Sequence, residues 1–124
     1  MSPEVDSALI IVGRIGLGGY FLIAGIRNFM NLAVLDPMMA ARNPPQPALL
    51  LRAGLTVQTL AGAMVTLSLW PALGAFALTL FTIAANAMFH AFWEHTGDER
   101  RTHINSVLTN CAVVGGLLLA IATG

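Results

Sequence analysis

The stretch NAMFHAFWEHTGDERRTHINSVLTN, residues 86–110, decides the fold of this chain. An apolar segment ends there in a polar, aromatic cluster, passes through a charged turn and leads into a second apolar segment. The chain has six basic and six acidic residues, and five of these lie in the turn, residues 94–101. Charged side chains are costly in lipid, and long apolar segments are costly in water. The pattern therefore predicts a hairpin whose turn lies in water and whose arms lie in a membrane.

The composition is that of a membrane protein. Of the 124 residues, 56% are hydrophobic and only 10% are charged, against roughly 25% charged residues in ordinary soluble domains. A chain of this length forms one domain, residues 1–124, and a small soluble domain could not bury so many apolar side chains. The net charge is zero, so no nucleic-acid partner is predicted. The N-terminal MSPEVDSA lacks the basic region of a signal peptide, so we expect the first apolar segment to remain as a membrane helix.

Four apolar segments are long enough to cross a bilayer, whose core of about 30 Å needs about 20 helical residues. We expect helices over residues 7–30, 48–69, 71–93 and 103–121. Pro71 suits the first turn of a helix, whereas the prolines of ARNPPQP, residues 41–47, exclude a continuous helix there. The sequence thus predicts an all-α integral membrane protein, a four transmembrane helix bundle surrounded by a lipid bilayer.

The arginines predict the orientation of this bundle. An even number of spans places both termini on one side of the membrane. Basic residues favour the cytoplasmic side. The loops 31–47 and 94–102 are therefore predicted to be cytoplasmic, with the termini outside. Five arginines lie in or beside these loops: Arg27, Arg42, Arg52, Arg100 and Arg101.

Arg14 is the most costly residue within the predicted membrane segments. It lies about seven residues into the first helix, or roughly 10 Å deep at about 1.5 Å per residue. An arginine near the bilayer centre costs about 2.5–3.5 kcal/mol, so it needs a polar partner or a path to the surface. We predict that Arg14 reaches Gln58 or Thr59, with Thr82 as a further partner. Snorkelling to the near surface is the alternative.

A second set of polar residues gathers near the membrane surface that carries the basic loops. Asn86, His90 and Glu94 have the i, i+4, i+8 spacing of one helix face. The candidate cluster consists of Arg14, Arg27, Gln58, Asn86, His90, Trp93 and Asn110. Such side chains could hold an anionic headgroup, a quinone carbonyl or a proton path. Alternatively, they cap helices, pair with phosphates and satisfy one another.

The sequence contains no recognisable catalytic set and favours a protein that is not an enzyme. A zinc-type site needs three or four convergent ligands, and the three histidines are too irregularly spaced to share a helix face. No metal is predicted, and no cofactor is implied, with a quinone as the possible exception. Small residues at every fourth position, Ala112, Gly116 and Ala120, allow close approach of another helix. That helix belongs either to the same bundle or to another membrane subunit or a second copy.

Four motifs in this order resemble the DoxX family of small bacterial membrane proteins. They are GRIGLGGYFLIAGIRNF (13–29), LAGAM (60–64), FHAFW (89–93) and LTNCAVVGGLLL (108–119). The resemblance implies a four-helix bundle in the bacterial cytoplasmic (inner) membrane. The residues of this chain that the resemblance matches to the family's motifs are Arg14, Gly25, Arg27, His90, Phe92, Trp93, Asn110, Gly115 and Gly116. The chain departs from the family pattern at Gln58 and Thr59, near which many relatives have an acidic residue, and at Arg27, where a lysine is frequent.

The resemblance leaves the function open between three classes. Some relatives are associated with thiosulfate:quinone oxidoreduction or with oxidative-stress complexes. The first expectation is therefore a non-catalytic subunit or scaffold of a larger membrane assembly. The alternative is a redox accessory protein that binds a quinone or another lipid-soluble carrier at the polar cluster. An oligomeric small-solute transporter ranks last, because no broken helix or inverted repeat is visible.

Overall fold

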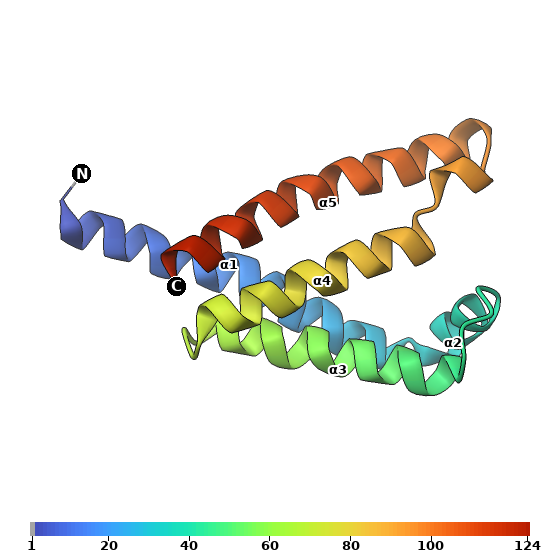
Figure 1. Ribbon diagram of the computed structural model, residues 1–124, viewed down its shortest axis with the longest axis horizontal. Coiled ribbons are helices and arrows are strands. Elements are labelled where there is room, and N and C mark those ends of the chain that lie inside the picture. The colour runs from blue at the N-terminus through green and yellow to red at the C-terminus, as the bar shows by residue number, and fades with distance from the viewer. Residues whose placement is uncertain (1) are drawn as a thin grey trace.

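The protein is all-α, as predicted. The computed structural model describes residues 2–124, which form five α-helices and one short 3-10 turn (Figure 1). These are α1 (Pro3–Met30), α2 (Leu32–Ala40), α3 (Pro47–Thr66), α4 (Pro71–Phe89), η1 (Phe92–Glu94) and α5 (Gly97–Thr123). Within this part of the chain, the segments Pro3–Met30, Pro47–Thr66, Pro71–Glu94 and Gly97–Thr123 are long and apolar enough to cross a membrane. The four predicted spans are therefore present.

Capping residues explain why α1 begins before the apolar segment. The Ser2 hydroxyl accepts a hydrogen bond from the Val5 amide at 3.2 Å, and Pro3 occupies the first turn. Glu4 and Asp6 add negative charge at the positive end of the helix. The helix consequently starts at Pro3 and not near residue 7.

Proline also sets the break between α3 and α4. Pro71 lies in the first turn of α4, as the sequence predicts. Ser68 and Trp70 have φ values of 56° and 46°, which are left-handed and end any preceding helix. The predicted end at residue 69 is therefore three residues too late, and α3 ends at Thr66.

The hairpin between α4 and α5 differs from its prediction at both ends. Helix α4 ends at Phe89, and Glu94 lies in η1. The expected helical face shared by Asn86, His90 and Glu94 is therefore wrong. Water at a charged turn can satisfy backbone groups that leave the helix, so the break is tolerated there. Helix α5 starts at Gly97, earlier than residue 103, with acidic residues in its first turn.

The predicted loop 31–47 contains a further helix, α2. Its residues Leu32–Ala40 precede the proline-rich stretch, which is non-helical from residue 41 to residue 46. Met39 is buried, and with Leu51 and Leu55 of α3 it forms a small hydrophobic cluster. Helix α2 is thus packed against the end of α3 and does not hang free in solvent.

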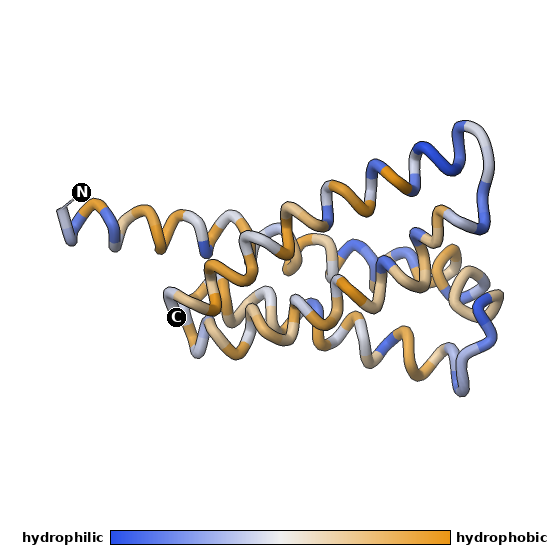
Figure 2. Tube along the Cα trace, turned by 45° about the horizontal axis from the view of Figure 1, so that its top comes forward, coloured by the Kyte–Doolittle hydropathy of each residue, from blue (hydrophilic) through white to orange (hydrophobic). Residues whose placement is uncertain are grey.

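The long helices pack closely at one end of the molecule and diverge at the other (Figure 1). The main core joins Phe21 of α1, Val65 of α3, Leu78 of α4 and Leu117 of α5. The hydrophilic residues gather mainly at the diverging end, where the α2–α3 and α4–α5 connections lie (Figure 2). Polar side chains therefore meet where the helices leave space between them.

The small residues of α5 are used largely within the chain. Ala120 is buried in the main core. A Cβ atom added at Gly116 would lie 4.0 Å from the Leu17 side chain of α1. Ala112 is exposed. Gly116 and Ala120 thus pack against helices of the same chain, which is the first of the two alternatives for these small residues.

Glycines bring α1 and α3 into backbone contact. A Cβ atom added at Gly18 would lie 2.5 Å from the Thr66 amide nitrogen, and one at Gly62 would lie 2.7 Å from the Leu22 amide nitrogen. Neither neighbour is a side chain that could move aside. The two helices can lie this close only because these positions carry no side chain.

Gly18→Ala is expected to destabilise the protein by about 1–3 kcal/mol, because the added methyl group overlaps the backbone of α3. Gly16→Ala is the matched control in the same helix, because a Cβ atom there meets nothing within 4 Å. This control should be neutral or stabilising by up to about 1 kcal/mol through helix propensity. Thermal unfolding in detergent, followed by circular dichroism, measures both. Equal destabilisation by the two variants would contradict the close approach.

Candidate functional site

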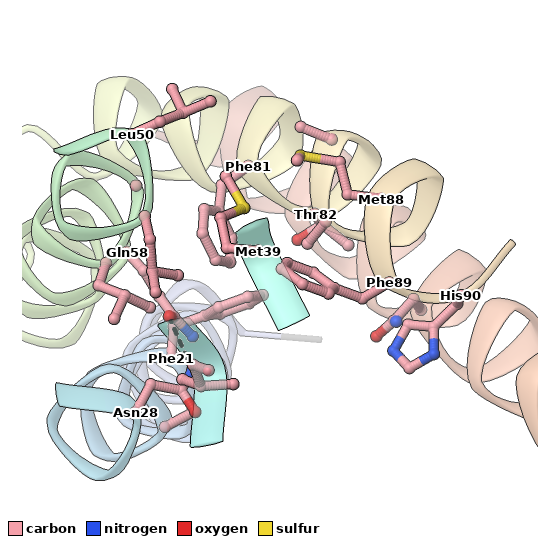
Figure 3. A pocket seen from close by; sticks show the side chains of 18 of the residues that line it. Phe21, Asn28, Met39, Leu50, Gln58, Phe81, Thr82, Met88, Phe89 and His90 are labelled. Atoms are coloured by element: carbon pink, nitrogen blue, oxygen red, sulfur yellow. Dashed lines mark hydrogen bonds between the residues drawn. The ribbon is translucent and has the colours of Figure 1, made fainter. Parts of the chain in front are cut away.

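A cavity of about 360 Å³ lies among α1, α2, α3 and α4 at the diverging end (Figure 3). Most of its wall is apolar or aromatic, with Phe21, Phe81 and Phe89 on different sides. Its polar side chains are few: Tyr20, Asn28, Gln58, Thr82, His90 and Asn110. No Asp, Glu, Lys or Arg among residues 2–124 lines it. A largely apolar cavity of this size with a few convergent polar groups is the usual form of a small-molecule site.

Gln58 and Asn28 form the polar group on the α1–α3 side of this cavity. Asn28 donates a hydrogen bond from Nδ2 to Gln58 Oε1 at 3.4 Å, a long contact (Figure 3). Gln58 is only 4% exposed. The Gln58 amide nitrogen donates to no other side chain or carbonyl within the described residues. This pair therefore retains hydrogen-bonding capacity toward the cavity.

Thr82 supplies the least satisfied polar atom of the wall. The residue is 4% exposed, and its hydroxyl Oγ1 is buried without a hydrogen-bond partner in residues 2–124. Thr79, one turn earlier in α4, donates its hydroxyl proton to the Ala75 carbonyl at 2.8 Å. An unsatisfied buried hydroxyl costs about 1–3 kcal/mol. A ligand oxygen beside Thr82 would remove that cost.

The wall between α4 and α5 is held by side-chain pairs. Asn110 donates a hydrogen bond from Nδ2 to Asn86 Oδ1 at 2.7 Å. The Nδ1 atoms of His90 and His103 lie 3.1 Å apart, so one of them carries a proton and the other accepts it. These pairs connect α4 to α5 where the helix backbones separate. They also leave His90 at the edge of the cavity.

Helix α2 closes the cavity toward the loops, and two ion pairs hold this end. Arg52 of α3 donates from both terminal nitrogens to Asp36 of α2, at 2.9 and 3.1 Å. Arg42 donates to Glu94 at 2.5 Å and so joins the α2–α3 connection to η1. The hydrogen bond with Glu94 raises the pKa of the Arg42 guanidinium above its ordinary value. Both pairs are solvent-exposed, so water screens them and they contribute little to stability.

The structure brings together part of the predicted cluster. Gln58, His90 and Asn110 line the cavity, and Asn86 bonds to Asn110. Arg14, Arg27 and Trp93 do not line it. The cavity adds Tyr20, Asn28 and Thr82 as polar groups and Met39 from α2. The sequence shows Thr82 as a polar residue of a membrane helix. It does not show that the Thr82 hydroxyl lacks a hydrogen-bond partner.

The predicted partners of Arg14 are wrong. Arg14 donates to the Ser68 hydroxyl at 3.3 Å and to the Thr123 carbonyl at 3.1 Å. It therefore ties the α3–α4 turn to the C-terminal end of α5, at the opposite end of the bundle from Gln58. Helix α1 begins earlier than expected and extends past the other helices at its N-terminal end (Figure 1), so Arg14 is level with the end of the bundle.

No metal centre can be built from the described residues. Among residues 2–124, no group of three or more His, Cys, Asp or Glu side chains is placed to hold a metal ion. The three histidines do meet near the α4–α5 hairpin, although their spacing did not indicate it. His103 pairs with His90 and stacks on His95, with ring centroids 4.3 Å apart.

The fold and the cavity define a class: a small, four-span, all-α membrane protein with a charge-free cavity at one end of its bundle. The chain belongs to the DoxX family, whose family profile matches residues 9–91. It is similar to the inner membrane protein YphA of Escherichia coli (strain K12), with 23% identity over 116 residues, covering 94% of this chain and 83% of that protein. No solved structure matches the chain. The resemblance in the sequence motifs is thus confirmed.

A double-mutant cycle tests the position of Arg14. Arg14→Met should lower the free energy of unfolding by about 1 kcal/mol, because two hydrogen bonds of a charged group are lost at a half-exposed site. Combined with Ser68→Ala, it should show a coupling energy of about 0.5 kcal/mol or more. Combined with Gln58→Leu, it should be additive within about 0.3–0.5 kcal/mol. Chemical or thermal unfolding in detergent measures all variants, and coupling to Gln58 alone would overturn the assignment.

Proposed function

We propose that the protein binds a neutral, lipid-soluble carrier of the quinone type in the cavity among α1–α4, as an accessory of membrane redox chemistry. One observation carries the proposal: the cavity contains a buried hydroxyl without a partner, on Thr82, and is lined by no charged side chain among residues 2–124. The hydroxyl is covered in the structure, so the Thr82 side chain would rotate toward the cavity, where a ligand oxygen would accept its proton. The apolar wall would surround the rest of the molecule.

The chemistry of the wall selects the ligand class. A charged ligand would leave water for a site without a counter-ion, which is strongly unfavourable. A pure hydrocarbon would leave the Thr82 hydroxyl unsatisfied and would use none of the hydrogen-bonding capacity that Gln58 retains. A ring that carries carbonyl or hydroxyl oxygens fits both requirements, and its apolar tail could remain in lipid. Quinones are membrane molecules of this kind.

Decyl-ubiquinone is the probe for this proposal. Thr82→Val should weaken its binding about fivefold to tenfold, the effect of one lost hydrogen bond of about 1–1.4 kcal/mol. The same substitution should leave the stability of the free protein unchanged or higher, because it removes an unsatisfied buried group. Isothermal titration calorimetry in detergent and thermal unfolding measure the two effects.

Thr79→Val is the matched control, since Thr79 is also buried on α4 but does not line the cavity. It should leave the affinity unchanged. Dodecyl phosphate, an anionic amphiphile, should not compete with decyl-ubiquinone. Absence of quinone binding to the unaltered protein, or equal losses in the two threonine variants, would sink the proposal.

A non-catalytic subunit or scaffold role is the second candidate. The membrane window of α5 is only 11% buried within the chain, against 33% for α3. A partner helix could cover the exposed side of α5. Extraction in mild detergent followed by mass measurement should then show co-migration with larger subunits. A lone protein or a homo-oligomer would count against this role and leave the carrier-binding proposal in place.

We also propose that the protein lies in the bacterial inner membrane with the α4–α5 hairpin in the cytoplasm and the N-terminus outside. The name of the Escherichia coli relative and the arginine-rich loops support this placement. In a Cys111→Ala background, a membrane-impermeant maleimide should label Glu4→Cys in intact spheroplasts. It should label Thr96→Cys only after lysis. The reverse pattern would invert the topology.

A further inference from the structure

The three histidines lie one beside the next between the cavity edge and the hairpin surface. His90 lines the cavity and lies 3.1 Å from His103, measured between the two Nδ1 atoms. The His103 ring stacks on His95, with 21° between their planes. His95 Nδ1 lies 3.3 Å from the Glu99 carboxylate, which is exposed. Of these contacts between imidazoles, the one between His90 and His103 has the length of a hydrogen bond, along which a proton can pass.

A second, polar cavity meets the first one at the same histidine. It has a volume of about 390 Å³. Tyr20 and His90 line it together with polar side chains of α5: Thr102, Asn105, Ser106, Thr109 and Asn110. Hydroxyl and amide groups in such a space require water or a polar ligand. Tyr20, His90 and Asn110 line both cavities, and these three side chains therefore lie between a largely apolar chamber and a polar one.

We propose that His90 and His103 form a proton-exchange junction between the polar cavity and a carrier bound in the charge-free cavity. The inference rests on the proposed function and adds to it the coupling of ligand binding to one proton. A carrier oxygen that accepts a hydrogen bond from the histidine pair is held more tightly when the pair is protonated. Binding then takes up a proton from water, which can reach the pair through the polar cavity at His90 or at the half-buried ring of His103.

The geometry limits the pair to one shared proton. The contact between the two Nδ1 atoms needs one N–H donor and one lone pair, so protonation of both nitrogens would break it. When His103 is protonated on both ring nitrogens, transfer of its Nδ1 proton to His90 Nδ1 leaves His103 neutral, with its proton on Nε2, and makes His90 an imidazolium with a free Nε2–H. His90 can then donate to the carrier oxygen. No bond other than N–H is made or broken, and no electron moves.

The other ionisable groups around the pair come from three sides. Tyr20 of α1 lines both cavities with His90. Glu94 is engaged by Arg42, and Arg100 of α5 lies over the Phe92 ring. Among the other groups of the hairpin, His95 stacks on His103, and Glu99 lies beside His95. Of these types of side chain, histidine is the one that ordinarily titrates between pH 5 and 8.

The affinity of the full-length protein for decyl-ubiquinone, measured by calorimetry from pH 5.5 to 8.5, tests the junction. Decyl-ubiquinone has no group that ionises between pH 5.5 and 8.5, and phenols ionise at higher pH. Because the bound state favours protonation of the histidine pair, the probe should bind most tightly at low pH and more weakly as the pH rises. One linked proton predicts a dissociation constant that rises by up to about tenfold per pH unit.

His103→Asn should remove this pH dependence while keeping the affinity seen at pH 8.5, because the amide can still hydrogen-bond to His90 but cannot titrate. His95→Asn is the matched control on the same hairpin and should keep the slope. Circular dichroism confirms that both variants are folded. Binding without pH dependence, or a slope that survives in His103→Asn, would overturn the junction alone. Absence of binding at every pH would instead overturn the proposed function and the junction with it.

Discussion

The backbone contact between α1 and α3 fixes the position of everything else in this protein. Gly18 lies against Thr66, Gly62 lies against Leu22, and Gly25 lies against Thr59. Each step of three or four residues forward in α1 is matched by an equal step backward in α3. The two helices are therefore locked antiparallel in one register, because any sliding would bring a side chain into a space that holds only glycine. The hydrogen bond between Asn28 and Gln58 lies next to the contact between Gly25 and Thr59.

This register explains both ends of the bundle. In one direction it places Arg14 beside Ser68, after α3 has ended. In the other direction, beyond Gly25 and Thr59, Leu51 and Leu55 of α3 pack against Met39 of α2. Space then remains between α3 and α4, and α2 folds across it. The cavity is thus the direct result of tight packing at one end combined with bulky residues at the other.

The fold was readable from the sequence, but the cavity was only partly so. Hydropathy identifies four spans because lipid imposes one length on every crossing helix. Gln58, His90 and Asn110 were predicted because polar residues in a membrane helix are rare and need a reason. The partners of these residues depend on the helix register, which apolar periodicity alone does not specify. Arg14 illustrates this. Its predicted partner Gln58 lies close to Asn28. Asn28 is 14 residues further along α1 than Arg14, or about 21 Å at about 1.5 Å per residue, so Gln58 is out of reach of Arg14.

The charged residues of the chain act as ties outside the cavity and leave its interior neutral. Arg14, Arg42 and Arg52 each bind another part of the chain, and all three lie outside the cavity wall. Gln58 is the position that keeps the wall neutral. The family resemblance implies that many relatives carry an acidic residue near it. A carboxylate at this depth, 4% exposed beside an asparagine, would have to be protonated or paired with a cation. In this chain the amide removes that titration, so the histidines at the α4–α5 side remain as the groups through which the cavity can respond to protons.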